Sequence, residues 1–226
     1  MATVPGQILD LKNWYLTLPV GEPKKPQLVY QPVLNTFSHT AHFCVASDPQ
    51  FVKFSASANG VTTANTKNPR SELREMVGDK QAKWSTTTGV HTMTVTQKVV
   101  ALPVGKPSVV IGQIHQGSDD LIEVRCWIPK GKTNTVIDVF HDSTNYGTLD
   151  KDYKLGTVYT YKIVAEGGHI KIFYNDMIKP VINIPSKCKT CFFKAGCYTQ
   201  ANLTVSGVKA DAFGEVWMSQ LKVEHL

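Results

Sequence analysis

The amino-acid sequence predicts an all-β fold, a sandwich of two packed antiparallel sheets. Short alternating or β-branched runs recur along the 226 residues, with turn residues between them. No long segment has apolar residues at the i, i+3, i+4, i+7 spacing of an amphipathic helix. Hydrophobic residues make up 42% and charged residues 19%, which is ordinary for a globular chain and argues against disorder, a collagen-like repeat or a coiled coil.

Ten strands are expected from these runs, enough for two packed sheets. They span residues 14–19, 70–77, 91–102, 108–115, 121–128, 135–140, 158–165, 169–174, 191–198 and 215–223. Gly167 and Gly168 separate two of them, and because glycines supply the positive φ of primed turns, these two strands should pair as an antiparallel hairpin. No linker, charge block or internal repeat marks a boundary, so residues 1–226 are expected to form a single domain.

The charge balance favours an anionic partner. Lysine and arginine together number 24 against 18 acidic residues, a net charge of +6, which suits nucleic acid, an acidic polysaccharide or a membrane surface. Only three of the basic residues are arginines, namely Arg70, Arg74 and Arg125. Arginine recognises carboxylates and phosphates in a planar, bidentate manner, whereas scattered lysines are mostly solvated, so the segment from Arg70 to Arg74 is the first candidate for a binding site.

Signals for membrane insertion are lacking, and the cysteines favour secretion. No run approaches the roughly 18 uninterrupted apolar residues of a membrane helix, and the N-terminal residues lack the basic start and apolar stretch of a signal peptide. The cysteines have no histidine partners at zinc-finger spacing, and Cys188 and Cys191 are expected to close a small loop disulfide. Together with a glycosylation sequon at Asn202, this disulfide favours a secreted protein.

Polar residues collect on one face of several expected strands. Because side chains alternate along a strand, residues i, i+2 and i+4 share a face. Arg70, Glu72 and Arg74 therefore lie together, so that one carboxylate can hold two guanidinium groups. Gln113 and His115 share a face of another strand. If these strands are neighbours, their polar faces line one groove.

A third strand repeats the pattern, with Lys194, Gly196, Tyr198 and Gln200 on one face. Gly196 is expected to leave space where a ligand can approach closely.

Each of these three sets of polar residues also has a simpler interpretation when taken alone. Charges on a strand commonly form an exposed salt-bridge ladder, a lone histidine or tyrosine is commonly structural, and most of the lysines are solvated. Three such strands in one chain favour a site.

Several other chemistries lack the residues that they need. Glycoside hydrolysis commonly uses two facing carboxyl groups, but Glu72 and Glu75 lie on opposite faces of their strand. Asp119 and Asp120 do the same if their segment is extended. No G-x-S-x-G nucleophile motif occurs, and the seven histidines show no ligand-like spacing. The sequence therefore predicts no metal site and no cofactor.

Arginine, glutamine, histidine and tyrosine side chains together suit β-elimination on a uronic acid. That reaction removes the proton on C5, next to a carboxylate, and expels the oxygen on C4. Arg70 and Gln113 can donate to the carboxylate as negative charge develops there. His115 can take the proton and Tyr198 can protonate the leaving oxygen, or Tyr198 can do both when the geometry is syn. None of these steps requires a metal.

Three blocks of sequence contain these residues. They are Arg-Ser-Glu-Leu-Arg-Glu at 70–75, Gln-Ile-His at 113–115 and Phe-Lys-Ala-Gly-Cys-Tyr-Thr-Gln at 193–200. In this order they resemble polysaccharide lyase family 7, the alginate lyases, and three ordered blocks are far more specific than one short motif. Weaker similarity covers nearly the whole chain, from Trp-Tyr-Leu-Thr-Leu-Pro at 14–19 to the last strand near Trp217.

The resemblance implies a β-jelly roll whose concave sheet forms a cleft for alginate, a polymer of mannuronate and guluronate. The family's carboxylate-neutralising arginine and glutamine match Arg70 and Gln113. Its histidine matches His115 and its catalytic tyrosine matches Tyr198. The implied activity is endo-acting, metal-independent cleavage of 1,4-glycosidic bonds that leaves 4,5-unsaturated uronate ends. Preference for mannuronate, guluronate or mixed blocks stays open.

The resemblance also implies residues that bind substrate. Arg74, Lys194 and Gln200 match positions that line the family's cleft, and Glu72 should hold the two arginines in place. Phe192 stands where the family frequently has a tyrosine, which removes one possible hydroxyl contact to substrate.

Two other functions compete with this interpretation. A non-catalytic carbohydrate-binding jelly roll for acidic polysaccharide would explain a groove, but it would not need His115 and Tyr198 together. A nucleic-acid-binding protein would interleave basic and aromatic residues, whereas these lysines are dispersed, so neither nucleic acid nor a membrane is expected as partner. The leading hypothesis is a secreted, monomeric alginate lyase.

Two segments, 62–69 and 142–154, are the candidate lid loops over the cleft. Gly, Asn, Asp and Thr concentrate in both of them.

Overall fold

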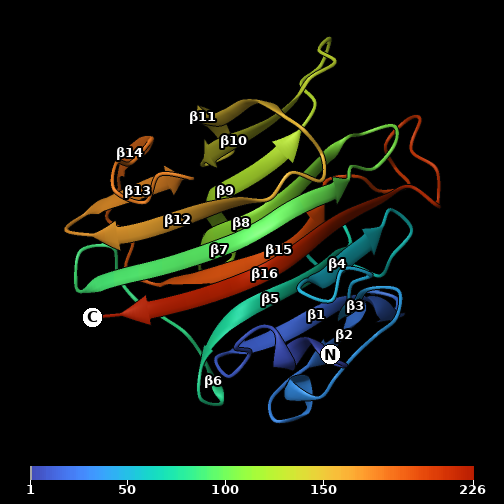
Figure 1. Cartoon of the computed structure of the whole chain (residues 1–226), viewed down its shortest axis with the longest axis horizontal. Coiled ribbons are helices and arrows are strands. Elements are labelled where there is room, and N and C mark those ends of the chain that lie inside the picture. The colour runs from blue at the N-terminus through green and yellow to red at the C-terminus, as the bar shows by residue number, and fades with distance from the viewer. Residues whose placement is uncertain (1) are drawn as a thin grey trace.

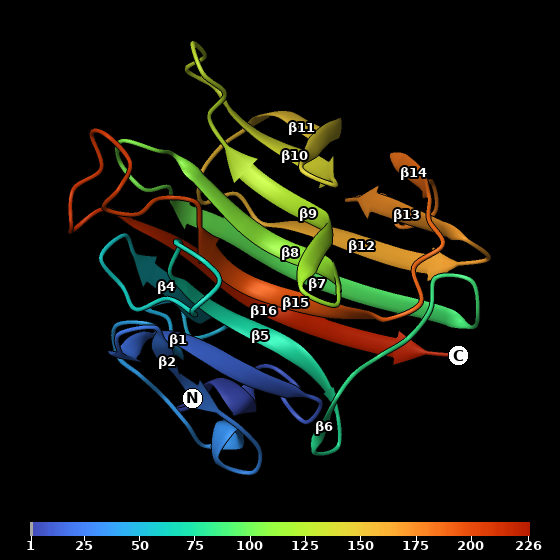
Figure 2. The same ribbon diagram turned by 180° about the vertical axis from the view of Figure 1, so that it is seen from behind.

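The computed structural model describes residues 2–226, which form two antiparallel sheets lying one behind the other (Figures 1 and 2). The nine-stranded sheet has the order β11 (Thr144–Tyr153), β10 (Thr135–His141), β9 (Asp119–Trp127), β8 (Ser108–Gln116), β15 (Cys191–Thr199), β5 (Arg70–Val77), β1 (Trp14–Glu22) and β2 (Lys25–Val29), with β6 (Lys80–Gln81) paired to β5. The seven-stranded sheet has the order β14 (Ile182–Pro185), β13 (His169–Tyr174), β12 (Tyr159–Glu166), β7 (Val90–Ala101), β16 (Phe213–His225), β4 (Val52–Ser57) and β3 (Phe43–Val45). Two short 3-10 helices, η1 (Pro5–Gln7) and η2 (Val33–Asn35), flank the first hairpin. The predicted two-sheet sandwich is confirmed.

An apolar core fills the space between the sheets. Leu16 and Leu18 of β1, Leu73 of β5 and Ile163 of β12 are fully buried in it. Because side chains alternate along each strand, these inward residues force their neighbours onto the outer face of the sheet. Truncating such a buried leucine to alanine costs about 2–5 kcal/mol, so the core fixes which residues face outward.

All ten predicted strands are present, with ends shifted by at most three residues. The predicted hairpin is also present. Gly167 and Gly168 have φ values of 55° and 78°, and β12 pairs antiparallel with β13 on either side of them. Six further strands were not predicted, namely β2, β3, β4, β6, β11 and β14. Most of these are short, and a strand of two to five residues shows too little alternation to stand out.

One of the two predicted lid loops is wrong. Segment 142–154 contains strand β11, which pairs along its length with β10. Asp142 and Ser143, with φ values of 47° and 64°, form the tight turn between the two strands. β11 is the edge strand of its sheet, and much of it is exposed. Its polar composition therefore reflects solvent exposure rather than a loop. Segment 62–69 does lie outside the strands.

A disulfide joins Cys188 to Cys191, as the sequence predicted. It lies at the start of β15, where Cys191 exchanges backbone hydrogen bonds of 2.7 and 2.9 Å with Trp84. Across residues 2–226, no helix has the length and apolar character needed to cross a membrane. In the same part of the chain, no three His, Cys, Asp or Glu side chains are grouped to hold a metal ion.

Candidate active site

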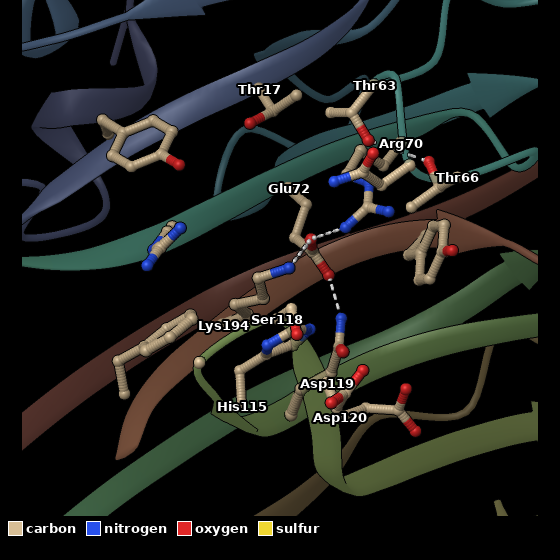
Figure 3. A pocket seen from close by; sticks show the side chains of 17 residues that line it. Thr17, Thr63, Thr66, Arg70, Glu72, His115, Ser118, Asp119, Asp120 and Lys194 are labelled. Carbon is tan, nitrogen blue, oxygen red and sulfur yellow. Dashed lines mark hydrogen bonds and ion pairs between the residues drawn. The ribbon is translucent and has the colours of Figure 1, made fainter. Parts of the chain in front are cut away.

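A cleft of about 420 Å³ lies on the outer face of the nine-stranded sheet (Figure 3). Its floor is formed by β1, β5, β15 and β8, which are neighbours in the sheet. Segment 62–69 and the turn between β8 and β9 also contribute to its lining. The cleft brings together seven of the eight predicted site residues, namely Arg70, Glu72, Arg74, Gln113, His115, Lys194 and Tyr198.

Strand register explains why residues so distant in sequence meet here. In the pairing of β15 with β5, Lys194 lies opposite Arg74 and Tyr198 lies opposite Arg70. On its other side, β15 places Lys194 opposite Gln113 of β8. Directly opposed residues of an antiparallel pair project to the same face. The three polar faces expected from alternation therefore form one continuous surface.

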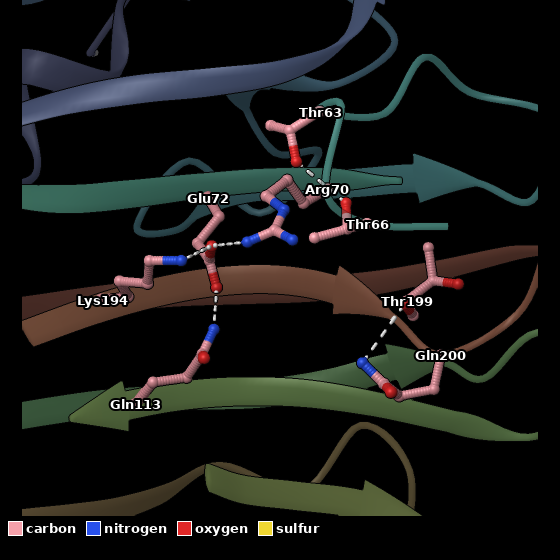
Figure 4. A network of polar contacts seen from close by, with 8 residues as sticks. All are labelled: Thr63, Thr66, Arg70, Glu72, Gln113, Lys194, Thr199 and Gln200. Atoms are coloured by element: carbon pink, nitrogen blue, oxygen red, sulfur yellow. Dashed lines mark hydrogen bonds and ion pairs between the residues drawn. The ribbon is translucent and has the colours of Figure 1, made fainter. Parts of the chain in front are cut away.

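Glu72 lies at the centre of this surface (Figure 4). Its Oε2 accepts a hydrogen bond from Arg70 Nη1 at 3.0 Å and lies 3.3 Å from Lys194 Nζ. Its Oε1 accepts a hydrogen bond from Gln113 Nε2. Glu72 is only 4% exposed, and burial would raise its pKa, but Lys194 and Arg70 together hold that pKa below its usual value. Glu72 is therefore a buried anion that orients donors from three strands.

The prediction that Glu72 holds both arginines is wrong for Arg74. Arg74 Nη2 donates to Gln81 Oε1 at 2.9 Å, and its guanidinium carbon lies 3.8 Å from the centre of the Phe192 ring. The place expected for Arg74 beside Glu72 is taken by Lys194. The physical reason is the aromatic ring at position 192, on which the planar guanidinium stacks.

His115 has an uncharged imidazole. Burial, followed by the positive charge of Lys194, lowers the pKa of His115 to about 3. Its ring stacks on Phe192 with the centroids 5.2 Å apart. Within residues 2–226, its buried Nδ1 has no hydrogen-bond partner. Because His115 lines the cleft, its neutral ring can accept a proton from a bound molecule through a nitrogen that faces the cleft.

Lys194 and Tyr198 have shifted pKa values of their own. Burial lowers the pKa of Lys194 to about 8, and the neighbouring Glu72 carboxylate opposes this shift. Burial raises the pKa of the Tyr198 phenol, while Arg70 acts in the opposite direction. The Arg70 guanidinium carbon lies 3.8 Å from the centre of the Tyr198 ring. Shifted titratable groups gathered in one cleft are typical of a catalytic site.

Two predictions for the end of β15 need correction. Gln200 does not line the cleft, because it lies just after the strand, and its Oε1 accepts from Asn68 Nδ2 at 3.5 Å. Gly196 does not provide space for a ligand. It has φ +140°, and a Cβ there would lie 2.6 Å from the Ser71 carbonyl oxygen. The backbone of β15 lies close to that of its neighbour β5 at this point, so the glycine is needed for strand pairing.

The cleft also contains residues that the sequence reasoning missed. Tyr15 and Thr17 of β1 line it, and alternation with the buried Leu16 would have indicated them. Asp119 and Asp120 both line it, although they were expected on opposite faces. The pairing of β8 with β9 shifts register beside them, which breaks the alternation. Lining residues of segment 62–69 carry no periodic signal, since that segment is a loop.

Comparison with known proteins identifies the family of the chain. The family model described as alginate lyase matches residues 9–225. Alginate lyase AlgAT5 from polysaccharide lyase family 7 is 41% identical, with a TM-score of 0.91 over 100% of both chains. The alginate lyase from Corynebacterium sp. is 39% identical, with a TM-score of 0.91 over 99% of both chains. No curated protein matches the chain.

More distant structures share the fold. A variant of the family 7 alginate lyase A1-II′, in complex with a product (GGG), is 24% identical, with a TM-score of 0.82 over 100% of both chains. The two-sheet sandwich is thus the jelly roll of these lyases. With the family match covering nearly the whole chain, the protein belongs to the alginate lyases of polysaccharide lyase family 7.

Proposed function

We propose that this cleft cleaves the 1,4-glycosidic bonds of alginate by β-elimination and leaves 4,5-unsaturated uronate ends. One observation carries the proposal. A single cleft combines three donors for a carboxylate, Arg70, Gln113 and Lys194, with the two proton-transfer candidates His115 and Tyr198. Alginate supplies both features that this set requires, because every sugar has a carboxylate next to its C5 proton.

The donors would lower the barrier for removing that proton. As the C5–H bond breaks, negative charge spreads onto the neighbouring carboxylate. Arg70 and Gln113 each use one N–H on Glu72. Their remaining N–H groups can donate to substrate. Because Glu72 already holds these donors in place, little reorganisation is needed as charge develops.

The proton would pass to His115 or Tyr198. Neutral His115 lines the cleft and can accept the proton, and Tyr198 can protonate the leaving oxygen on C4. When the proton and the leaving oxygen lie on the same face of the sugar, Tyr198 can serve both steps. In either case the C5–H and C4–O bonds break, a C4=C5 double bond forms, and the enzyme regains its starting protonation after releasing both products.

Two further parts of the proposal rest on the family resemblance. The enzyme cleaves bonds within the alginate chain, and it requires no metal. Substrate contacts are better supported for Lys194, at the centre of the cleft, than for Gln200, outside it. We also propose that the enzyme acts as a secreted monomer, because its substrate is a polymer and its Cys188–Cys191 disulfide suits an oxidising compartment. Cell fractionation and light scattering test these two points.

The direct test follows the ultraviolet absorbance of the new conjugated double bond. Mannuronate-rich and guluronate-rich alginates are incubated separately with the protein, with chelator present, beside a Tyr198→Phe variant. We expect absorbance to rise with the wild-type protein and the variant to lose at least about 99% of the rate. Early products of mixed length would support internal cleavage. Binding of alginate without any rise would contradict the proposal and leave a carbohydrate-binding module.

A further inference from the structure

A chain of three titratable side chains joins the two sheets behind the cleft floor. Glu75 extends from β5 of the nine-stranded sheet, and its Oε1 lies 2.5 Å from Nε2 of His225 on β16. His225 Nδ1 lies 2.7 Å from Nδ1 of His91 on β7. His91 Nε2 in turn lies 2.8 Å from the carbonyl oxygen of Thr88. A strand of the cleft floor is thus linked to two strands of the other sheet.

Each of the three contacts in this chain needs one proton. A carbonyl oxygen can only accept, so His91 Nε2 carries a proton toward Thr88. The facing Nδ1 atoms of His91 and His225 need a proton between them, because two lone pairs at 2.7 Å would repel. The contact of His225 Nε2 with the Glu75 carboxyl group needs one as well. Two neutral imidazoles have only two ring protons, so the chain contains a third.

The surroundings of Glu75 assign this third proton to the histidines. Glu75 is 1% exposed, and its Oε2 accepts from Trp84 Nε1 at 2.9 Å and from the backbone N–H of Phe193 at 2.8 Å. Two donors on one oxygen favour the ionised carboxylate. Trp84 also stacks on the His91 ring with the centroids 4.5 Å apart, and an indole face attracts a cation. The histidine pair therefore carries one positive charge, which balances that of Glu75.

The groups that face the histidine pair come from four elements. β5 brings the Glu75 carboxylate. The segment before β7 brings Trp84 and β15 brings Phe193, and neither side chain is charged. β16 itself adds Glu224, which forms its own exposed ion pair, and the carboxylate of Leu226, which accepts a backbone N–H of β7 at 2.8 Å. Glu75 is thus the anion in direct contact with the pair.

We propose that the proton shared by His91 and His225 clamps the two sheets together, and that the clamp opens as pH rises. When this proton leaves, one contact loses its hydrogen bond and the buried Glu75 loses its counter-charge. The folded chain holds a proton that the unfolded chain releases, so the stabilisation is complete at low pH and is lost as pH increases. Phe192 and Lys194, on either side of Phe193, line the cleft, so the clamp lies directly behind its floor.

The test compares denaturant unfolding of the wild-type protein and two variants between about pH 6 and about pH 9. In His225→Gln and His91→Gln, the amide nitrogen replaces Nε2 and keeps the outer hydrogen bond, but Nδ1 and its proton are lost. Above about pH 6.5, the wild-type unfolding equilibrium constant should rise, relative to either variant, by up to about tenfold per pH unit. The double variant should add no further change, because both substitutions remove one shared proton.

An exposed histidine provides the matched control. His169 Nδ1 contacts Asn183 Oδ1 at 3.1 Å, outside the clamp. His169→Gln removes the same titratable group and should keep the pH dependence of the wild-type protein.

Nitrogen NMR of histidine-labelled wild-type protein detects the proton without unfolding. Near pH 8 a free histidine is neutral, with one proton on each ring. We expect the pair to hold three ring protons at this pH, one of them between the two Nδ1 atoms. One proton on each ring of the folded protein would overturn the inference.

The same pH dependence of unfolding in the wild-type protein and in both glutamine variants would also overturn it. If one variant does not fold, the other carries the comparison, and the NMR measurement needs neither. None of these readouts uses lyase activity. A failure of the proposed function would therefore leave the clamp standing, and a failure of the clamp would leave the proposed function standing.

Discussion

At the scale of single residues, the site depends on one buried carboxylate. Glu72 binds Arg70 of its own strand, Lys194 of β15 and Gln113 of β8. A charge buried this deeply is tolerated only when partners surround it. The same contacts restrict the rotamers of three side chains that face the cleft, so the donors are in position before substrate arrives.

Glu72→Gln should therefore affect stability as well as catalysis. The change leaves two buried cations without their anion, and we expect the free energy of unfolding to fall by about 3 kcal/mol. Displacement of Arg70 and Gln113 should lower the lyase rate roughly a hundredfold. Chemical denaturation and the absorbance assay measure the two effects. Glu166→Gln, which breaks the half-exposed pair with Lys171, is the control and should cost about 0.5 kcal/mol or less. Equal losses in both variants would contradict the account.

The lowered pKa of Lys194 predicts that substrate binding depends on pH. Because burial lowers its pKa to about 8, the ammonium is charged below that pH and loses its charge above it. Alginate is a polyanion, so KM should rise between about pH 7 and about pH 9 as that charge is lost. Lys194→Arg keeps its charge over this range and should show a flatter KM profile in initial-rate measurements. The same rise in the arginine variant would assign the effect to another group.

Alternation along strands predicted the cleft-facing side of the four proposed catalytic residues, but not which partners the side chains choose. The outward faces of Arg70, Gln113, His115 and Tyr198 follow from inward neighbours that fill the core. The choice of Lys194 over Arg74 as partner of Glu72 depends on cross-strand register and on a stacked ring. Neither is encoded in the spacing within one strand.

At the scale of elements, the bulge in β15 determines how that strand fits between β5 and β8. The pairing of β15 with β8 shifts register between Ala195 and Tyr198, whereas its pairing with β5 stays regular, and Lys194 and Tyr198 both line the cleft. Gly196 lies within this irregular stretch, with its backbone against Ser71 of β5. The close approach of the two backbones leaves no room for a side chain.

Gly196→Ala should consequently destabilise the protein strongly. The added Cβ meets a backbone oxygen at 2.6 Å and the backbone has φ +140°, so we expect a loss of about 3 kcal/mol or more. Gly78→Ala isolates the contribution of backbone conformation, because Gly78 has φ +61° with no atom within 4 Å of its Cβ in the described chain. It should cost about 1–2 kcal/mol in denaturant unfolding. Equal costs would show that close packing at Gly196 is unimportant.

Element type was easiest to predict where one face of a strand is buried. The ten predicted strands alternate or carry β-branched runs because they border the core. β11 was missed since it is a partly exposed edge strand, and the register shift beside Asp120 broke the alternation expected there. Exposed edges and bulges lack the periodic signal on which such predictions depend.

At the scale of the whole molecule, the fold assembles one site from segments far apart in the chain. β5 and β8 flank β15 in the sheet, although some 75 residues of chain separate β8 from β15. Alternation predicts a polar face on each strand but not the order of strands in the sheet. The structure shows that order (Figure 2), and the core between the two sheets lies behind the strands that form the floor of the cleft.

The central claim is that this floor presents one uronate to Arg70, Gln113, His115 and Tyr198 together. The most direct test is a crystal structure of the Tyr198→Phe variant with a bound alginate oligosaccharide. We expect one sugar carboxylate within hydrogen-bond distance of Arg70 and Gln113, with C5 facing His115 and the ring of residue 198. An oligosaccharide bound elsewhere on the sheet, or one whose carboxylates all avoid these donors, would contradict it.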